Sequence, residues 1–259
     1  MLSSTFCRGG SNIAASISVQ HIQAFDYKIK VYLFCKASLL GSNPLTIDSI
    51  HVGFGQPRLF FRTNLIYLAN DVSLNVYEST VTYPAEGKYL IYFELPNRIS
   101  NIYNIPHSVN VPLFTESEIS VVDPLLSCLN NSPQIDSTLF FLCPVGKEFR
   151  MTPVWREIDN DSLSFSLVAC QGVLNTAAPG YTFPAGLTIN NFSGELRWNA
   201  PTLGNYPYNA VIRLDEWRQG FNIGHVNHEI ELSTVASADT NYYFQNISNQ
   251  IDSNSTSVF

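Results

Sequence analysis

Charged residues are scarce in this chain of 259 residues. They make up 14% of it, against about a quarter in an average soluble domain. Acidic residues outnumber basic ones by 21 to 14, which gives a net charge of −7. Because a nucleic-acid-binding surface needs a basic footprint, the composition excludes that class of partner. With 45% hydrophobic residues the chain is globular, and its surface polarity must come mainly from Ser, Thr and Asn, which favours an extracellular all-β module.

Long apolar runs are also missing. No stretch reaches the roughly 18 apolar residues of a membrane-spanning helix, so we expect no membrane span. Residues 1–16 contain Arg8 but lack the apolar segment of a secretory signal. We therefore expect the signal to lie upstream of this sequence; the alternative is a protein that is not exported.

Cysteines are few and odd in number: Cys7, Cys35, Cys128, Cys143 and Cys170. They form no Cys-x-x-Cys pair and no Cys/His cluster with metal spacing, which excludes zinc-binding and thioredoxin-like sites. We predict one disulfide, between Cys143 and Cys170, because the start and the end of two neighbouring antiparallel strands lie within disulfide reach. Cys35 is predicted to be a buried thiol. Buried free thiols throughout are the alternative.

Catalytic motifs are absent as well. The chain has no Gly-x-Ser-x-Gly elbow, phosphate-binding loop or dinucleotide fingerprint. His225 and His228 stand three positions apart on an expected strand, so their rings point to opposite faces and cannot share a metal. Asp215 and Glu216 face opposite ways for the same reason, and Glu216 is expected to pair with Arg213 or Arg218. We predict that the protein is not an enzyme.

The hydrophobic pattern that is present has a period of two residues, typical of strands with one buried face. Tyr208, Ala210, Ile212 and Leu214 form the longest clean alternation and predict a central strand. Turn residues separate many such stretches, and none has a helical period with caps. The expected strands include residues 27–33, 45–54, 58–68, 72–83, 88–95, 116–122, 163–167, 208–214 and 225–233. The fold class predicted is all-β, with two tandem immunoglobulin-like β-sandwich domains.

A cluster of turn-forming residues, Asn130-Asn131-Ser132-Pro133, predicts a linker. It places one domain at residues 13–123 and a second at 133–235. Residues 236–259 are a polar tail or the truncated start of a further domain. Since domains joined by a linker make contacts like those of transient complexes, we expect two separate cores and a small, largely polar interface.

Three acidic residues alternate in one short segment: Glu157, Asp159 and Asp161. Carboxylates at this spacing can converge on Ca²⁺, which takes several oxygen ligands from a tight loop. Asn160 stands where a turn needs a residue that tolerates a positive φ. The segment thus predicts a calcium site. The alternative is a solvated turn whose carboxylates accept hydrogen bonds from backbone N–H groups.

Several motifs of this chain resemble, in the same order, motifs of known families of surface proteins. The second domain resembles the cadherin-like sandwich domains of large Bacteroidota surface proteins, many of which carry gliding-motility-associated, type IX sorting domains. Where that family has Asp-x-Asp-Gly-Asp-Ser-Leu-x-Tyr, this chain has Asp159-Asn160-Asp161-Ser162-Leu163-Ser164-Phe165. The other matching segments are residues 131–133, 189–198, 204–206 and 216–224. The first domain resembles the PKD-like domain that precedes it in such proteins, through residues 54–55, 82–89 and 97–110.

The resemblance covers most of residues 16–232 and implies an exported, non-catalytic surface module, often one of several in tandem. The chain departs from the family pattern at Asn160, which replaces Gly, and at Glu157 and Asn190, which replace Asp. Gln56-Pro57 also stands where the family has Asp-Gly. These departures weaken the calcium inference.

The predicted function is a structural or adhesive module of a secreted or cell-surface protein. Its partners would be other domains of the same polypeptide or other cell-surface proteins, with glycans and self-association as further candidates. The alternative is a carbohydrate-binding or spacer module of a secreted polysaccharide-degrading enzyme. Glycan binders present exposed, coplanar aromatic rings, for which Tyr206, Tyr208, Trp217 and Phe221 are the candidates.

Overall fold

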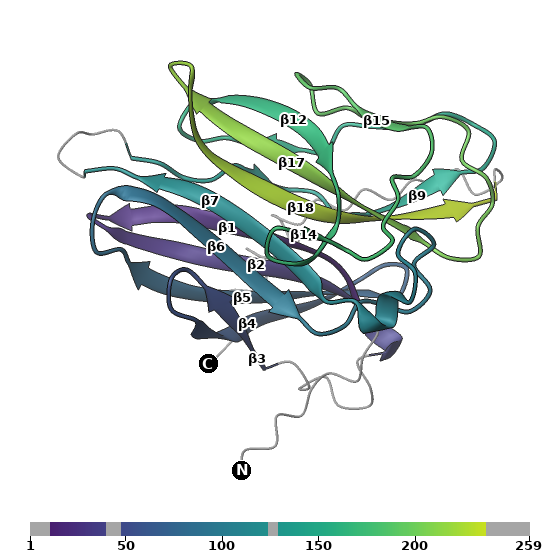
Figure 1. The fold of residues 1–259 in the computed structure, drawn as a ribbon, viewed down its shortest axis with the longest axis horizontal. Helices are drawn as coiled ribbons and strands as arrows, with labels where there is room; N and C mark the ends of the chain where they lie inside the picture. The colour runs from purple at the N-terminus through teal and green to yellow at the C-terminus, as the bar shows by residue number, and fades with distance from the viewer. Residues whose placement is uncertain (1–10, 40–47, 124–128, 237–259) are drawn as a thin grey trace, which may run out of the picture.

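The computed structural model describes residues 11–39, 48–123 and 129–236. In these ranges the only helical segments are two 3-10 turns, η1 (Ala37–Leu39) and η2 (Ser108–Asn110), and no helix is long and apolar enough to cross a membrane. The remainder is strand and loop. The predicted fold class, all-β with sandwich-like halves, is confirmed (Figure 1).

The first half contains seven antiparallel strands in the spatial order β1-β2-β5-β4-β3-β6-β7. Short turns join β1 to β2, β3 to β4, β4 to β5 and β5 to β6, as the period-two pattern with intervening turn residues predicts, whereas the connections before β3 and before β7 are longer. The strands are β1 (Asn12–Gln23), β2 (Asp26–Lys36), β3 (Ser49–Gly53), β4 (Arg58–Leu68), β5 (Val72–Thr82), β6 (Gly87–Leu95) and β7 (Leu113–Val121).

The second half is built on the antiparallel order β12-β17-β18, with β17 between its neighbours as predicted for residues 208–214. Two small sheets, β10-β16-β15 and β11-β8, complete it. The strands are β8 (Gln134–Ile135), β9 (Phe140–Pro144), β10 (Phe149–Met151), β11 (Trp155–Arg156), β12 (Ser162–Val168), β13 (Gln171–Val173), β14 (Thr176–Ala177), β15 (Leu187–Ile189), β16 (Leu196–Trp198), β17 (Tyr208–Arg218) and β18 (Phe221–Val235).

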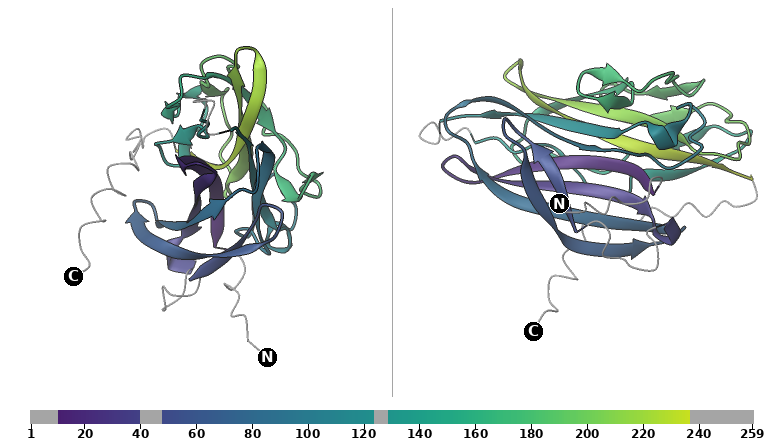
Figure 2. Two further views of the ribbon diagram at one scale, coloured as in Figure 1. Left: turned by 90° about the vertical axis from the view of Figure 1, so that its left-hand side faces the viewer. Right: turned by 60° about the horizontal axis from the view of Figure 1, so that its bottom comes forward.

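The long strand β18 belongs to both halves. One of its edges pairs with β17. Its other edge pairs first with β7, where Gly224 faces Ile119, and then with β1, where Glu229 faces Ala15. Its last residues, 231–235, pair in parallel with β9. A single sheet of 13 strands therefore runs through the two halves, whose strands lie side by side in two views (Figure 2).

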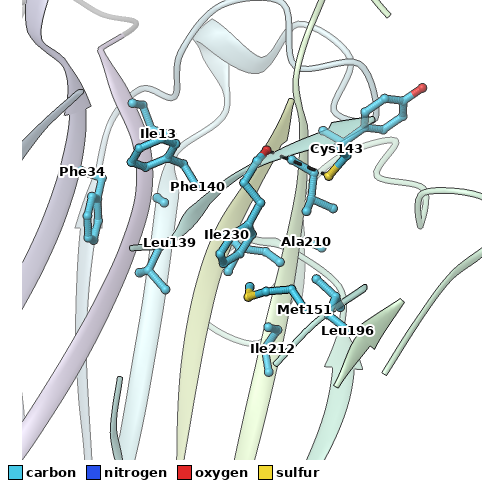
Figure 3. Packing of buried hydrophobic residues seen from close by; sticks show 14 of the residues in the cluster. Ile13, Phe34, Leu139, Phe140, Cys143, Met151, Leu196, Ala210, Ile212 and Ile230 are labelled. Carbon is cyan, nitrogen blue, oxygen red and sulfur yellow. Dashed lines mark hydrogen bonds between the residues drawn. The ribbon is translucent and has the colours of Figure 1, made fainter. Parts of the chain in front are cut away.

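The hydrophobic core is shared too. One cluster combines Ile13 and Phe34 of the first half with Phe140, Ile212 and Ile230 of the second (Figure 3). Another lies within the first half, around β1, β2, β6 and β7. Both clusters exist because β2 is buried on two faces: the adjacent residues Leu33 and Phe34 belong to different clusters. The expectation of two separate cores with a small, largely polar interface is therefore wrong.

The predicted linker is part of this packing. Asn130, Asn131 and Ser132 are buried. The backbone N–H of Ser132 donates to the Val19 carbonyl at 2.8 Å, and the Val19 N–H donates back to Ser132 Oγ at 2.8 Å. The linker thus extends the edge of β1. Residues 124–128 and the predicted tail from 237 onward lie outside the described residues, and the domain boundaries themselves stay a prediction.

A buried ion pair joins the halves. Arg98, in the segment after β6, and Glu229 of β18 both have fully buried side chains, and Arg98 Nη1 donates to Glu229 Oε1. Asn209 Nδ2 of β17 donates to the same oxygen at 2.6 Å. The other Arg98 nitrogens donate to the backbone carbonyls of Pro112 at 3.0 Å and Gln171 at 2.6 Å. One guanidinium therefore connects segments next to β6, β7, β13 and β18.

This pair yields a prediction about cooperativity. Arg98→Met should lower the free energy of unfolding by about 3–5 kcal/mol, because it leaves the Glu229 carboxylate buried without its cation. Both halves should still unfold together, since they share a sheet and a core. The measurement is urea denaturation followed by tryptophan fluorescence and circular dichroism.

The matched control is Arg150→Met, which removes an exposed arginine that pairs with Glu148; it should leave the unfolding curve unchanged. Two separate unfolding transitions in the parent, or an Arg98→Met curve like that of the control, would contradict this account.

Candidate functional site

The acidic segment between β11 and β12 forms a closed turn. Asn160 has a φ of 63°, the left-handed conformation predicted for it. The Glu157 carboxylate accepts hydrogen bonds from the backbone N–H groups of Asp159 at 2.9 Å and Asp161 at 2.7 Å. These bonds are the ones that the hydrogen-bonded alternative expects of such a turn.

The other two predicted ligands are bound by residues distant in sequence. Asp159 accepts the backbone N–H and the side-chain Nδ2 of Asn131, at 2.6 and 2.8 Å. Asp161 accepts a bidentate pair of bonds from Arg218 at the end of β17, at 2.8 Å from Nε and 2.6 Å from Nη2. Two parallel bonds between a guanidinium and a carboxylate are among the strong hydrogen bonds of proteins. The pairing of β12 with β17 is what brings these partners, 57 positions apart, together.

A fourth carboxylate, that of Glu216, completes the cluster. One oxygen from each of Glu157, Asp159, Asp161 and Glu216 lies within 4.8 Å of the others. Glu216 is only 1% exposed; its Oε2 accepts from Asn130 at 3.4 Å, and its Oε1 has no hydrogen-bond partner in the described part of the chain.

The expected partners of Glu216 bind elsewhere. Arg213 Nε donates to Asp215 at 3.0 Å, and the bidentate bonds of Arg218 go to Asp161. A sequence signal for Glu216 did exist: it continues the inward-facing series of Ala210, Ile212 and Leu214 by two positions, which places a carboxylate in the interior.

Burial sets the charge state of Glu216. Loss of solvent around the carboxyl group, followed by the negative charge of Asp161, raises its pKa from 4.5 to about 8. Glu216 is therefore protonated at neutral pH. The hydrogen bond to Asp161 in turn raises the pKa of Arg218. Repulsion among the four carboxyl groups is therefore reduced in three ways: backbone N–H groups bind Glu157 and Asp159, the Arg218 guanidinium binds Asp161, and Glu216 keeps its proton.

The cluster fits a cation only in part. Its carboxylate oxygens suit Ca²⁺, which prefers oxygen ligands. However, Arg218 already neutralises Asp161, so an ion would have to compete with the guanidinium, and the present bonds favour the hydrogen-bonded turn. Calcium at Glu157, Asp159 and Asp161 stays a prediction.

The predicted disulfide between Cys143 and Cys170 is wrong. Both residues are buried free thiols. Cys143 lies on β9, beside Thr234 of β18, whereas Cys170 follows β12 and packs with Ile99. The pairing fails because β9 and β12 are not neighbours: β9 runs parallel to β18, and β12 is next to β17. Burial raises the pKa of both thiols. Cys7 and Cys128 lie outside the described residues.

Cys35 is a buried thiol, as predicted. The two histidines of β18 also point to opposite faces as expected. His225 Nε2 lies 3.6 Å from a Glu116 carboxylate oxygen, while His228 Nδ1 is hydrogen-bonded to Ser16 at 2.7 Å. Desolvation lowers the pKa of His228 to about 3, so its ring is neutral. The two rings form no metal pair.

The candidate glycan-stacking residues do not share one face. Tyr208 is buried between Tyr103 and Trp198. Trp217 and Phe221 are 37% and 74% exposed near the turn between β17 and β18. Tyr206 is exposed just before β17, at the strand's other end. Since β17 is 11 residues long and a strand rises about 3.3 Å per residue, these rings cannot form one platform.

No model of a known protein family matches the chain, and no curated protein matches its sequence. Solved structures that align with the chain include tandem immunoglobulin domains. The two tandem V-type regions of a v-region-containing chitin binding protein align over 85% of this chain and 99% of theirs, with 10% identity and a TM-score of 0.42. Tandem Ig repeats of Dlar align over 86% and 99%, with 9% identity and a TM-score of 0.28. At these scores the likeness carries no functional argument.

The buried Glu216 predicts a pH dependence of stability. The unfolded chain releases this proton above about pH 4.5, whereas the folded protein holds it until about pH 8. The contribution of Glu216 is therefore fully present below pH 4.5 and is lost as the pH rises toward 8. Glu216→Gln, which stays neutral, should remove this part of the pH dependence and be the more stable protein at pH 9. The measurement is the free energy of unfolding in urea between pH 5 and 9.

Asp215→Asn, a change at the adjacent and partly exposed carboxylate, is the matched control and should keep the parent's profile. If Glu216→Gln loses stability with pH as steeply as the parent does, the carboxyl group is ionised in the folded state.

The calcium prediction has its own test. A ligand bound only by the folded state raises the melting temperature by mass action. Millimolar Ca²⁺ should therefore raise it relative to chelator in the parent, and more strongly in Arg218→Gln, where the competing guanidinium is gone. The double variant Asp159→Asn/Asp161→Asn should show no rise. If Ca²⁺ changes the melting temperature of neither the parent nor Arg218→Gln, the calcium prediction is wrong and hydrogen bonds alone hold the turn.

Proposed function

We propose that the chain is a non-catalytic structural or adhesive module of an exported cell-surface protein. The observation that carries the proposal is the single 13-stranded sheet with a core shared between the halves. Such a sheet makes the two halves one stiff unit rather than two domains on a hinge. A stiff unit suits a part that spaces or presents a contact surface.

The ionisable groups of the described interior support a structural role. Arg98 and Glu229 are fully buried and paired, and His228 is buried and neutral at physiological pH. Substrate could not reach these groups without opening the core. The acidic turn, for its part, consists of carboxylates bound to backbone N–H groups, an amide and a guanidinium, an arrangement that stabilises a loop.

The wider assignment rests on the resemblance to PKD-like and cadherin-like modules. On that basis the chain is secreted or displayed at the cell surface, in a type IX-sorted protein of the gliding-motility-associated kind. Its partners are other domains of the same polypeptide or other surface proteins. The low content of charged residues and the excess of acidic ones agree with an extracellular module.

A cell-surface location is tested on cells that produce the full-length protein. Antibodies against residues 11–236 should label intact cells, and external protease should remove the signal without lysis. A cytoplasmic protein of the same cells, probed in parallel, should resist the protease and stay unlabelled. Labelling that appears only after the cells are permeabilised would contradict the proposal.

A further inference from the structure

A cleft with a volume of about 340 Å³ lies where the two halves meet. One side is the loop of residues 100–109, which precedes β7, and the other is Tyr206, which precedes β17. The 3-10 turn η2, a short teal coil in Figure 1, forms part of this loop. The volume is within the range of about 300–1,000 Å³ that small-molecule sites occupy.

Two tyrosines flank the cleft. Tyr103 is 63% exposed and Tyr206 is 48% exposed. The Tyr103 ring lies on Tyr208 with centroids 4.7 Å apart, and Tyr208 packs edge-to-face on Trp198 at 5.0 Å. This stack braces Tyr103 from behind, so that a ligand need not order the ring itself. The accessible apolar surface between the two tyrosines comes from Pro106 and Val109, while Ile102 and Ile105 are buried beneath the loop.

The loop is held in one conformation before any ligand binds. Ser108 Oγ donates to the Ile99 carbonyl at 2.7 Å and accepts the Ile102 N–H at 3.1 Å. The Tyr103 N–H donates to the Pro207 carbonyl at 2.8 Å, which fixes the loop to the second half. Fixing a site in its binding geometry lowers the entropic cost of association.

Two residues of the cleft adopt a backbone conformation that side chains other than glycine seldom take. Asn101 has a φ of 62° and His107 a φ of 53°. Such conformations persist where the surrounding structure imposes them, and they cluster at ligand sites. Both residues are exposed, so their side chains present an amide and an imidazole to the cleft and to solvent.

The lining contains no Lys, Arg, Asp or Glu. A phosphate, a carboxylate or an ammonium group would therefore find no opposite charge there. What the cleft offers is apolar surface, mainly from tyrosine rings, Pro106 and Val109, beside a similar amount of polar surface from neutral groups that include Ser100, Asn101 and His107. Sugar rings have that same combination, apolar C–H faces edged by hydroxyl groups, and tyrosine rings bind both parts. We infer that this cleft binds a neutral saccharide, stacked against Tyr103 and Tyr206.

The inference deepens the proposed adhesive function, on which it rests, by naming a ligand class and a place. It also differs from the sequence expectation. Of the four aromatic residues singled out there, only Tyr206 lines this cleft, and Tyr208 acts as the support for Tyr103.

The test is affinity electrophoresis of the folded chain through gels that contain laminarin, xylan, galactomannan or dextran, four neutral polysaccharides. At least one should retard the parent. Tyr103→Ala and Tyr206→Ala should each weaken that retardation by about tenfold or more in dissociation constant, as expected for truncation of a stacking residue. Tyr103→Phe should bind close to the parent, because the ring face is kept.

Tyr67→Ala is the matched control: it removes another tyrosine, 60% exposed on β4, and should bind like the parent. Thermal unfolding establishes that each variant is folded. Retardation by none of the four polysaccharides, retardation only by an acidic one such as alginate, or equal binding by parent and folded Tyr103→Ala/Tyr206→Ala would overturn the inference. None of these results affects the surface-labelling test, so failure here leaves the adhesive function standing.

Discussion

The pairing of one strand with three different partners is the constraint on which this structure depends. Around Glu229 the free edge of β18 passes from β7 to β1 and then to β9. Backbone groups lose their ladder partners at such a branch point, and buried carbonyls need replacements. Arg98 lies beside this branch point, where its planar guanidinium donates at once to Glu229 of β18 and to the carbonyls of Pro112, next to β7, and Gln171, on β13. The buried charge therefore lies where the sheet divides.

The same strand shows which features of the fold could be predicted from the sequence and which could not. Alternation identified β2 and β17 correctly, because each repeats apolar residues at every second position. In β18, however, the alternate positions are His225, Asn227, Glu229 and Glu231, which read as a solvent-facing side. All four are buried in the structure. Periodicity shows that alternate residues face the same side of the sheet, but it does not show that a polar side is exposed to solvent. The expectation of separate domains came from the turn-forming residues 130–133, a local signal that says nothing of how this polar face is covered.

The acidic turn, too, was predictable in its local features but not in its tertiary contacts. Its local features, the left-handed Asn160 and the convergence of three carboxylates, follow from nearest-neighbour chemistry and were predictable. Their partners were not, because Asn131, Glu216 and Arg218 reach the turn through strand pairing and the path of the linker. Carboxylates this close repel one another unless a cation or several donors lie among them, and the fold supplies both: the Arg218 guanidinium, and the N–H groups that bind Glu157 and Asp159.

The turn also has a mechanical role that its composition does not reveal. Asn131 donates twice to Asp159, and its own side-chain oxygen accepts the His21 N–H at the end of β1. The acidic turn of the second half thereby holds the linker against the first half. A change of charge at the turn, by protonation or by a cation, acts at the junction of the halves rather than on an isolated surface loop.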